Sequence, residues 1–162
     1  MMLAWKHRPI EVANLLNPPF CAEILRRCFF AYEKHSNDYF PYPLTFLILP
    51  IVLHKKTRET INSKTKDHLD AWIHKHQEVR IGFAERAKQL LPITNEALTF
   101  LLNSDSVEIN NFAKIIMKDY SPKKIEDENE VSDCFKKSAI VGKWFSKSGN
   151  PTTIYTMWGV RP

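Results

Sequence analysis

Four side chains that commonly ligate metal ions lie close together in the chain, namely His68, Asp70, His74 and His76. Ligands on one helix face need a spacing of three or four residues. His76 instead shares its face with apolar residues, which are Leu69, Trp72 and Ile73. We therefore predict solvated or capping histidines here and no bound metal ion.

Other residue patterns that carry chemistry are missing from the sequence. The glycines Gly82, Gly142, Gly149 and Gly159 are isolated, so they form no glycine-rich phosphate loop. No G-x-S-x-G motif marks a hydrolase nucleophile. We expect Cys21, Cys28 and Cys134 to be small buried hydrophobic residues. The sequence thus predicts no cofactor, no catalytic residue and no enzyme activity.

Basic residues are concentrated in one connecting segment. Residues 54–66 hold five basic residues and one acidic residue, a local balance of +4 in a chain whose net charge is +5. Lysines and arginines in such a segment can contact DNA phosphates. The candidates for phosphate contact are Lys55, Lys56, Lys64 and Lys66. A basic loop that is simply solvated remains the alternative.

The apolar pattern predicts a mainly α-helical chain that forms one domain over residues 1–162. We expect N-terminal helices over 1–62, among them a short helix at 10–16, one that begins near Pro19 and a buried helix at 44–54 that Pro50 kinks or shortens. Residues 119–130 read as a polar linker. The segment 131–162 reads as a C-terminal helix followed by a docking tail.

The middle segment, 66–118, predicts a unit that resembles a winged helix-turn-helix. Helical patterns near 69–76, over 79–91 and over 93–102 are followed by a hairpin at 107–116, and Pro92 is expected to end the second helix. The pair Asn110-Asn111 suits a tight two-residue turn. The third helix carries no lysine or arginine, which argues against sequence-specific reading of the major groove.

The remaining composition points to a cytoplasmic protein that docks on other proteins. An odd count of three cysteines and the absence of an apolar leader predict a reducing compartment. The longest uncharged run, 39–53, is too short and too rich in proline for a membrane span. The tail 152–162 is aromatic and nearly uncharged, so we expect it to meet another protein surface.

Four blocks of sequence resemble the middle component of bacterial three-component ABC-ATPase systems, the group that includes Lamassu-type anti-phage defence. The blocks are 14–21, 42–58, 79–87 and 142–162, and the most distinctive residues are the H-K-x-T-R stretch at 54–58 and the C-terminal block. The resemblance implies a non-catalytic subunit that bridges an SMC/Rad50-like ABC ATPase and a nuclease-type effector. It also implies that the complex senses DNA and that this subunit holds the effector inactive.

The resemblance brings no functional residues with it, so the candidate partner contacts are inferred from residue type alone. They are Arg58, Arg80, Arg86, Trp158 and Arg161, since arginine and tryptophan dominate interface energetics. Within such a complex, non-specific contact with double-stranded DNA would involve the four lysines named above. The rival interpretation is a stand-alone winged-helix DNA-binding regulator, and a catalytic effector is the third class.

Overall fold

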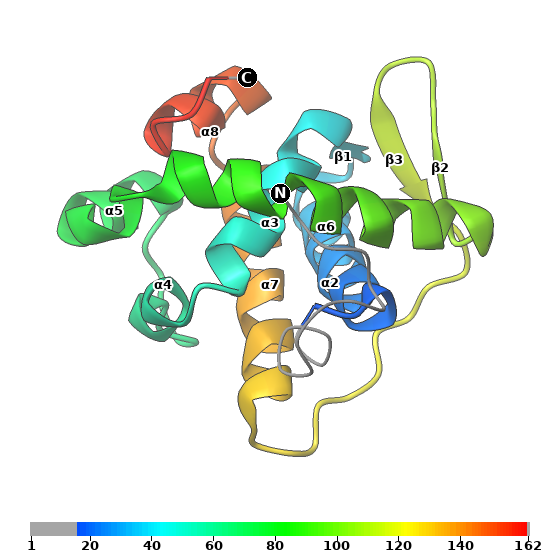
Figure 1. Cartoon of the computed structure of the whole chain (residues 1–162), viewed down its shortest axis with the longest axis horizontal. Helices are drawn as coiled ribbons and strands as arrows, with labels where there is room; N and C mark the ends of the chain where they lie inside the picture. Colours follow the sequence, from blue (N-terminus) through cyan, green and yellow to red (C-terminus); the bar gives the residue numbers. More distant parts are fainter. Residues whose placement is uncertain (1–15, 162) are drawn as a thin grey trace.

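Two helices that are distant in the sequence form the centre of the molecule. In the computed structural model, which describes residues 16–161, α2 (Pro18–Ser36) packs along α7 (Glu130–Ser146) more extensively than any other pair of described elements. The long helix α6 (Phe83–Asn103) crosses α2 and α3 (Thr45–Val52), as Figure 1 shows. The helix expected over 10–16 lies almost wholly outside the described residues.

Capping residues explain where the two central helices begin. The side chain of Asn17 accepts a hydrogen bond from the amide of Phe20 at 2.7 Å, and prolines occupy the first positions of α2. At α7, Asn129 and Ser132 exchange hydrogen bonds in a capping box. The helix expected near Pro19 and the C-terminal helix are therefore confirmed.

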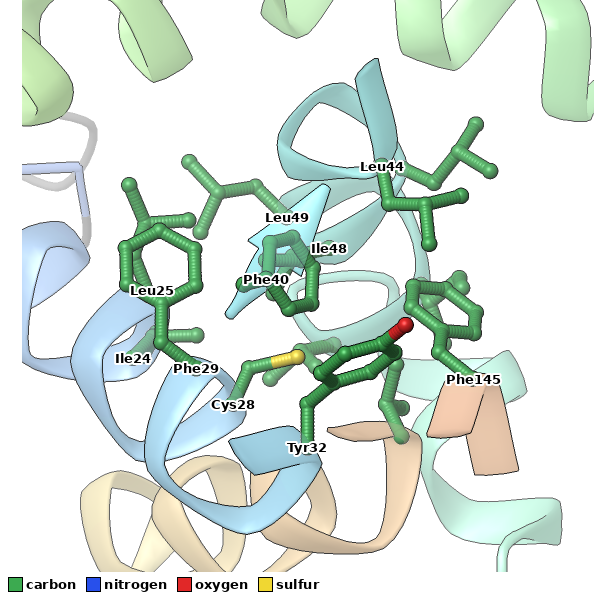
Figure 2. Close-up of a cluster of buried hydrophobic side chains, with 14 of the residues drawn as sticks. Ile24, Leu25, Cys28, Phe29, Tyr32, Phe40, Leu44, Ile48, Leu49 and Phe145 are labelled. Carbon is green, nitrogen blue, oxygen red and sulfur yellow. The ribbon is translucent and has the colours of Figure 1, made fainter. Parts of the chain in front are cut away.

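Aromatic side chains from α2, β1 and α7 meet in the core beside α3 (Figure 2). The rings of Phe29 and Phe40 lie 4.7 Å apart, and Tyr32 meets Phe40 edge to face at 5.1 Å. All three cysteines are buried in this core, as predicted. Burial raises the pKa of the Cys28 thiol well above its ordinary value, so it stays protonated.

The apolar segment around Pro50 forms the buried helix that was predicted. In α3 every residue but Phe46 is buried. The helix ends at Val52, two residues after Pro50, and the short helix α4 (Lys55–Thr60) follows at once. The prediction that Pro50 shortens this helix is confirmed.

Helix α6 continues through Pro92, so the break predicted there is wrong. Pro92 lies on the exposed side of the helix. The buried stripe of Phe83, Ile93, Ala97 and Leu101 runs past it against the core. That packing outweighs the roughly 3 kcal/mol that an internal proline costs a helix. Because no turn divides α6, the predicted helix-turn-helix does not form, while the mainly α prediction is confirmed.

The predicted hairpin is present and belongs to a small three-stranded antiparallel sheet. Strands β2 (Val107–Ile109) and β3 (Lys114–Met117) form it, and β1 (Phe40–Pro41) pairs with the other side of β3. The turn is longer than the two residues expected. The side chain of Asn110 accepts hydrogen bonds from the amides of Phe112 and Lys114, and the positive φ falls on Ala113.

The remaining elements lie around this centre. Residues 118–129 contain no helix or strand, and Tyr120 donates a hydrogen bond to Glu23 of α2 at 2.9 Å. The short helices α5 (Leu69–Lys75), η3 (Gln77–Arg80) and α8 (Pro151–Met157) lie near the N-terminal end of α6 (Figure 1). No helix between residues 16 and 161 has the length and apolar character of a membrane span.

Candidate partner-binding surface

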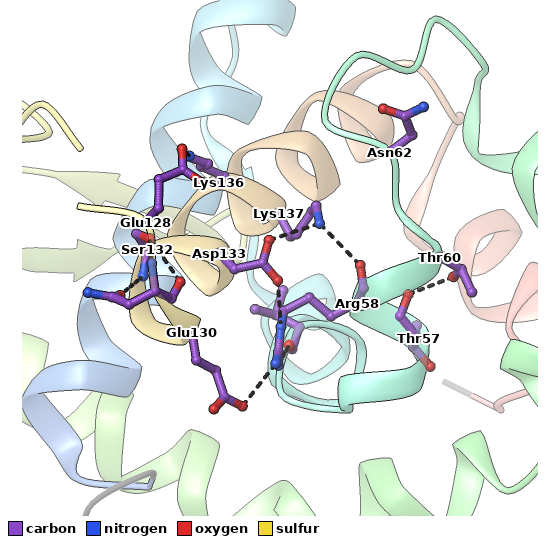
Figure 3. Close-up of polar contacts among 12 residues, drawn as sticks. Thr57, Arg58, Thr60, Asn62, Glu128, Glu130, Ser132, Asp133, Lys136 and Lys137 are labelled. Carbon is purple, nitrogen blue, oxygen red and sulfur yellow. Dashed lines mark hydrogen bonds and ion pairs between the residues drawn. The ribbon is translucent and has the colours of Figure 1, made fainter. Parts of the chain in front are cut away.

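Arg58, the first of the predicted partner contacts, lies inside the protein. Its side chain is 4% exposed and forms ion pairs with Glu130 at 3.0 Å and Asp133 at 2.9 Å, both on α7 (Figure 3). It also donates to the carbonyl oxygen of Val52 at 3.0 Å. Arg58 therefore connects α4 to the end of α3 and the first turns of α7, and its position gives it an internal role.

A second buried cation completes this polar cluster. Lys137 is paired with Asp133 at 2.9 Å and donates to the carbonyl oxygen of Arg58 at 3.4 Å. Burial by itself would raise the pKa of Asp133, but hydrogen bonds and charges from Lys137 and Arg58 lower it below its ordinary value. The Asp133 carboxylate is thus held in its charged form between two cations.

Trp158 also lies in the interior, so the expectation of an exposed aromatic tail is wrong. The side chain is 1% exposed and stacks on Phe83 with ring centroids 4.4 Å apart. Ile154 and Tyr155 of α8 are buried as well. The tail packs against its own domain because α6 and α5 present aromatic rings to it. The ring centroids of Trp72 in α5 and Trp158 lie 5.9 Å apart.

The Phe83–Trp158 stack forms the floor of an open hollow of about 600 Å³, here called the η3–α6 hollow. Its lining comes from η3, the start of α6 and the residues after α8. It consists of Gln77, Arg80, Ile81, Gly82, Phe83, Ala84, Glu85, Trp158 and Gly159. Ile81 is 76% exposed at this site. The structure therefore brings an exposed isoleucine and an exposed arginine together above two aromatic rings.

Of the predicted arginines, Arg80 lines this hollow, and Arg86 lies next to one of its lining residues, Ile81. Arg80 is exposed, and its Nη2 atom would lie 3.1 Å from a Cβ placed on Gly159. Arg86 is half-buried and donates to the carbonyl oxygen of Ile81 at 3.2 Å. Burial lowers the pKa of Arg86 below its ordinary value. Arg161 is exposed beyond α8.

The four predicted phosphate-contact lysines, Lys55, Lys56, Lys64 and Lys66, are all exposed. Their segment is fixed to the core, since the indole of Trp72 donates to the Thr60 carbonyl and that of Trp144 to the Asp67 carbonyl. Because Arg58 is buried, the connector presents less positive charge at the surface than its sequence suggests. In addition, Nζ of Lys55 lies 3.9 Å from the carboxylate of Glu59, with which it forms an ion pair.

Histidines do not gather into a metal site in the described part of the chain. No group of three or more histidine, cysteine, aspartate or glutamate side chains between residues 16 and 161 is arranged to hold an ion. His76 instead faces Glu78 at 3.3 Å and packs against Trp72. His54 bonds to Thr57, and burial together with Arg86, Lys56 and Arg58 lowers its pKa.

Sequence reasoning missed the residues that shape the η3–α6 hollow. Ile81 was an unremarked apolar residue, and Gly82 and Gly159 were counted only as isolated glycines. Both glycines have φ of +71°, a conformation that L side chains rarely adopt. The signal available in the sequence was Gly82, which directly precedes a long helical pattern.

Comparison with known proteins gives one family. Neither the curated proteins nor the solved structures hold a significant match to this chain. A family model described as "ABC-three component (ABC-3C) system Middle Component 3" matches residues 5–162. Because this match covers nearly the whole sequence, the chain belongs to the family of ABC-three component system middle components.

Proposed function

We propose that this chain is a non-catalytic bridging subunit that binds an ABC ATPase on one side and an effector on the other. The observation that carries the proposal is the family match over residues 5–162, because a middle component implies partner subunits in the same system. The η3–α6 hollow supports it, since an exposed isoleucine beside an arginine is typical of protein interfaces.

The finer parts of the proposal concern what the partners do. The ATPase is of the SMC/Rad50 kind and recognises DNA, the effector is a nuclease, and the complex acts in the cytoplasm in Lamassu-type defence against phage. In this proposal the bridging subunit keeps the effector inactive until the ATPase has bound DNA. The rival role as a winged-helix regulator has lost its main support, because α6 is one continuous helix.

A reconstitution with purified subunits tests the bridging role. The ATPase, the effector and this chain are mixed in pairs and all together, and the complexes are sized by light scattering after gel filtration. We expect the ATPase and effector to elute together only when this chain is present. If they elute together equally well without it, the bridging role is wrong.

A nuclease assay on the same samples tests the inhibitory role. We expect this chain to suppress cleavage by the effector, and ATPase, ATP and duplex DNA together to restore it. Cleavage at the same rate with and without this chain would show that it does not restrain the effector.

A further inference from the structure

An open groove of about 360 Å³, here called the α2–α7 groove, lies between the two central helices. Its basic lining residues are Arg27, Lys34 and His35 of α2 and Lys143 of α7. Within residues 16–161, no aspartate or glutamate lines it. Its described lining shares no residue with that of the η3–α6 hollow, and a bridging subunit needs two separate surfaces.

Two cations of this groove have no anionic partner. Arg27 forms an ion pair with Glu23 at 3.0 Å, so its own charge is balanced. Among the described residues, by contrast, the side chains of Lys34 and Lys143 have no hydrogen-bond or ion-pair partner. Lys34 also borders a neighbouring hollow that contains carboxylates, but it forms no ion pair with any of them. The groove therefore presents uncompensated positive charge from both helices.

The basic residues lie near the ends of the two helices. Lys34 and His35 occupy the last turn of α2, and Lys143 that of α7. Cations there also interact favourably with the helix macrodipole, a role that would appear as a change in stability. The imidazole of His35 donates through Nδ1 to the carbonyl oxygen of Ala31 at 2.8 Å, which holds the ring at the edge of the groove.

Apolar side chains form the rest of the lining. They come from both helices and from the segment that precedes α7, and are Phe30, Ala31, Ala139, Ile140 and Pro122. Gly142 brings the helices together here, since a Cβ on it would lie 3.1 Å from that of Ala31. Arg27 donates to the carbonyl oxygen of Lys123 at 2.9 Å and so keeps the segment with Pro122 against α2. Such a lining suits a ligand that carries both carboxylates and an apolar side chain.

We propose that the α2–α7 groove binds an acidic segment of one partner subunit, with an apolar side chain against Phe30 and Ile140 and carboxylates at Lys34 and Lys143. This inference deepens the proposed bridging function and rests on it. Aspartate or glutamate would form charge-assisted hydrogen bonds with the two lysines. A protein segment fits this lining better than a DNA backbone, because phosphates offer no apolar group to place against Phe30 and Ile140.

Charge reversal at the two unpaired lysines tests the proposal. The full chain carries Lys34→Glu or Lys143→Glu, and its dissociation constants for the purified ATPase subunit and for the effector subunit are measured by calorimetry. Both lysines are exposed, so the variants should stay folded, and the melting temperature of each is measured alongside. We expect each variant to raise the dissociation constant for the same partner about tenfold or more and to leave the other partner unaffected.

A third variant tests the apolar contact. Ala139→Gln lengthens a half-buried lining side chain without changing its charge, so it should fill part of the groove. We expect it to raise the dissociation constant for the partner that the lysine variants affect. Circular dichroism checks that this variant is folded, and if it is not, the exposed lysine variants decide the question.

The matched control is Lys88→Glu. Lys88 is exposed on α6 and lines neither the α2–α7 groove nor the η3–α6 hollow. Because this variant changes the net charge by the same amount, it should bind both partners as the parent does. An equal loss of binding with Lys88→Glu would show an effect of net charge and would overturn the inference. A charge-reversal scan of the affected partner should find an acidic residue whose lysine variant restores binding to the Lys143→Glu chain.

The outcomes separate the two proposals. If the parent chain binds both subunits and the two lysine variants bind them equally well, only this inference is wrong, and a changed melting temperature would then assign the lysines to the helix ends alone. If Lys143→Glu weakens binding to random duplex DNA but not to either subunit, the groove is a phosphate site and the inference is again wrong. If the parent binds neither subunit, the bridging function falls and this inference falls with it.

Discussion

At the scale of single residues, the buried ion pairs of Arg58 make a testable contribution to stability. Its side chain is 4% exposed and holds two carboxylates of α7. We expect Arg58→Ala to lower the free energy of unfolding by about 3 kcal/mol, because it leaves buried polar groups without their partner. Urea denaturation measures the change. Lys55→Ala is the control, since its pair with Glu59 is solvent-exposed, and it should cost less than about 0.5 kcal/mol. Equal losses would contradict the internal role of Arg58.

Asp133 predicts how stability depends on pH. Burial opposes its ionisation, yet Lys137 and Arg58 together lower its pKa in the folded protein. A lowered carboxyl pKa contributes stability above the unfolded value of about 4, and this stability is lost as the pH falls through the folded value. We expect the free energy of unfolding to decrease below about pH 4. The Asp133→Asn variant should be less stable than the parent at pH 7, and its free energy of unfolding should decrease less on acidification. A parallel decrease in both proteins would exclude Asp133 as a cause.

At the scale of elements, the contact between α2 and α7 depends on Gly142. A Cβ there would lie 2.2 Å from the carbonyl oxygen of Cys28, so the helices would have to move apart. On an exposed helix, glycine to alanine gains about 1 kcal/mol. Here we expect Gly142→Ala to lose about 2 kcal/mol or more, because overpacking reverses the sign. Thermal unfolding followed by circular dichroism checks this. Lys143→Ala, at the exposed neighbouring position, should change stability by less than about 0.5 kcal/mol.

Helix α8 packs into the core, so removing the C-terminal tail would test the stability of the fold as well as partner binding. Trp158 is 1% exposed and stacked on Phe83. We expect Trp158→Ala to destabilise the fold by about 3–5 kcal/mol, measured by urea denaturation. Deleting 152–162 would therefore lose partner binding through unfolding. The surface substitution Arg161→Ala should leave stability unchanged. A stable, fully folded Trp158→Ala variant would show that the tail is not needed for the fold.

At the scale of the whole molecule, the exposed lysines predict weak and steeply salt-dependent DNA binding. Replacing Lys55, Lys56, Lys64 and Lys66 with glutamine should reduce the slope of log affinity against log salt by about 0.9 for each phosphate contact removed. A salt titration with random duplex measures it. Lys123 and Lys124, changed to glutamine together, serve as the control pair on another surface. Nanomolar, sequence-selective binding by the isolated chain at physiological salt would instead support a DNA-binding regulator.

The sequence predicted the elements whose signals are local. Asn17 with the prolines after it marks the start of α2, and the apolar run broken by Pro50 marks α3. The helix end predicted at Pro92 was wrong because the cost of a proline is a local property of the sequence. The packing that outweighs this cost involves residues far away in the chain. The buried stripe on either side of Pro92 binds α6 to α2 and α3, two helices that lie far earlier in the chain.

The candidate site shows the same division between local and long-range information. The sequence by itself determined a mainly helical chain with a basic connector, an aromatic C-terminus and the composition of a protein-binding subunit. Only the tertiary structure decided which arginines and aromatic rings reach the surface. Arg58 is buried because carboxylates more than 70 residues away meet it, and Trp158 because Phe83 does. Exposure is set by contacts between distant segments, so residue type and spacing alone do not fix it.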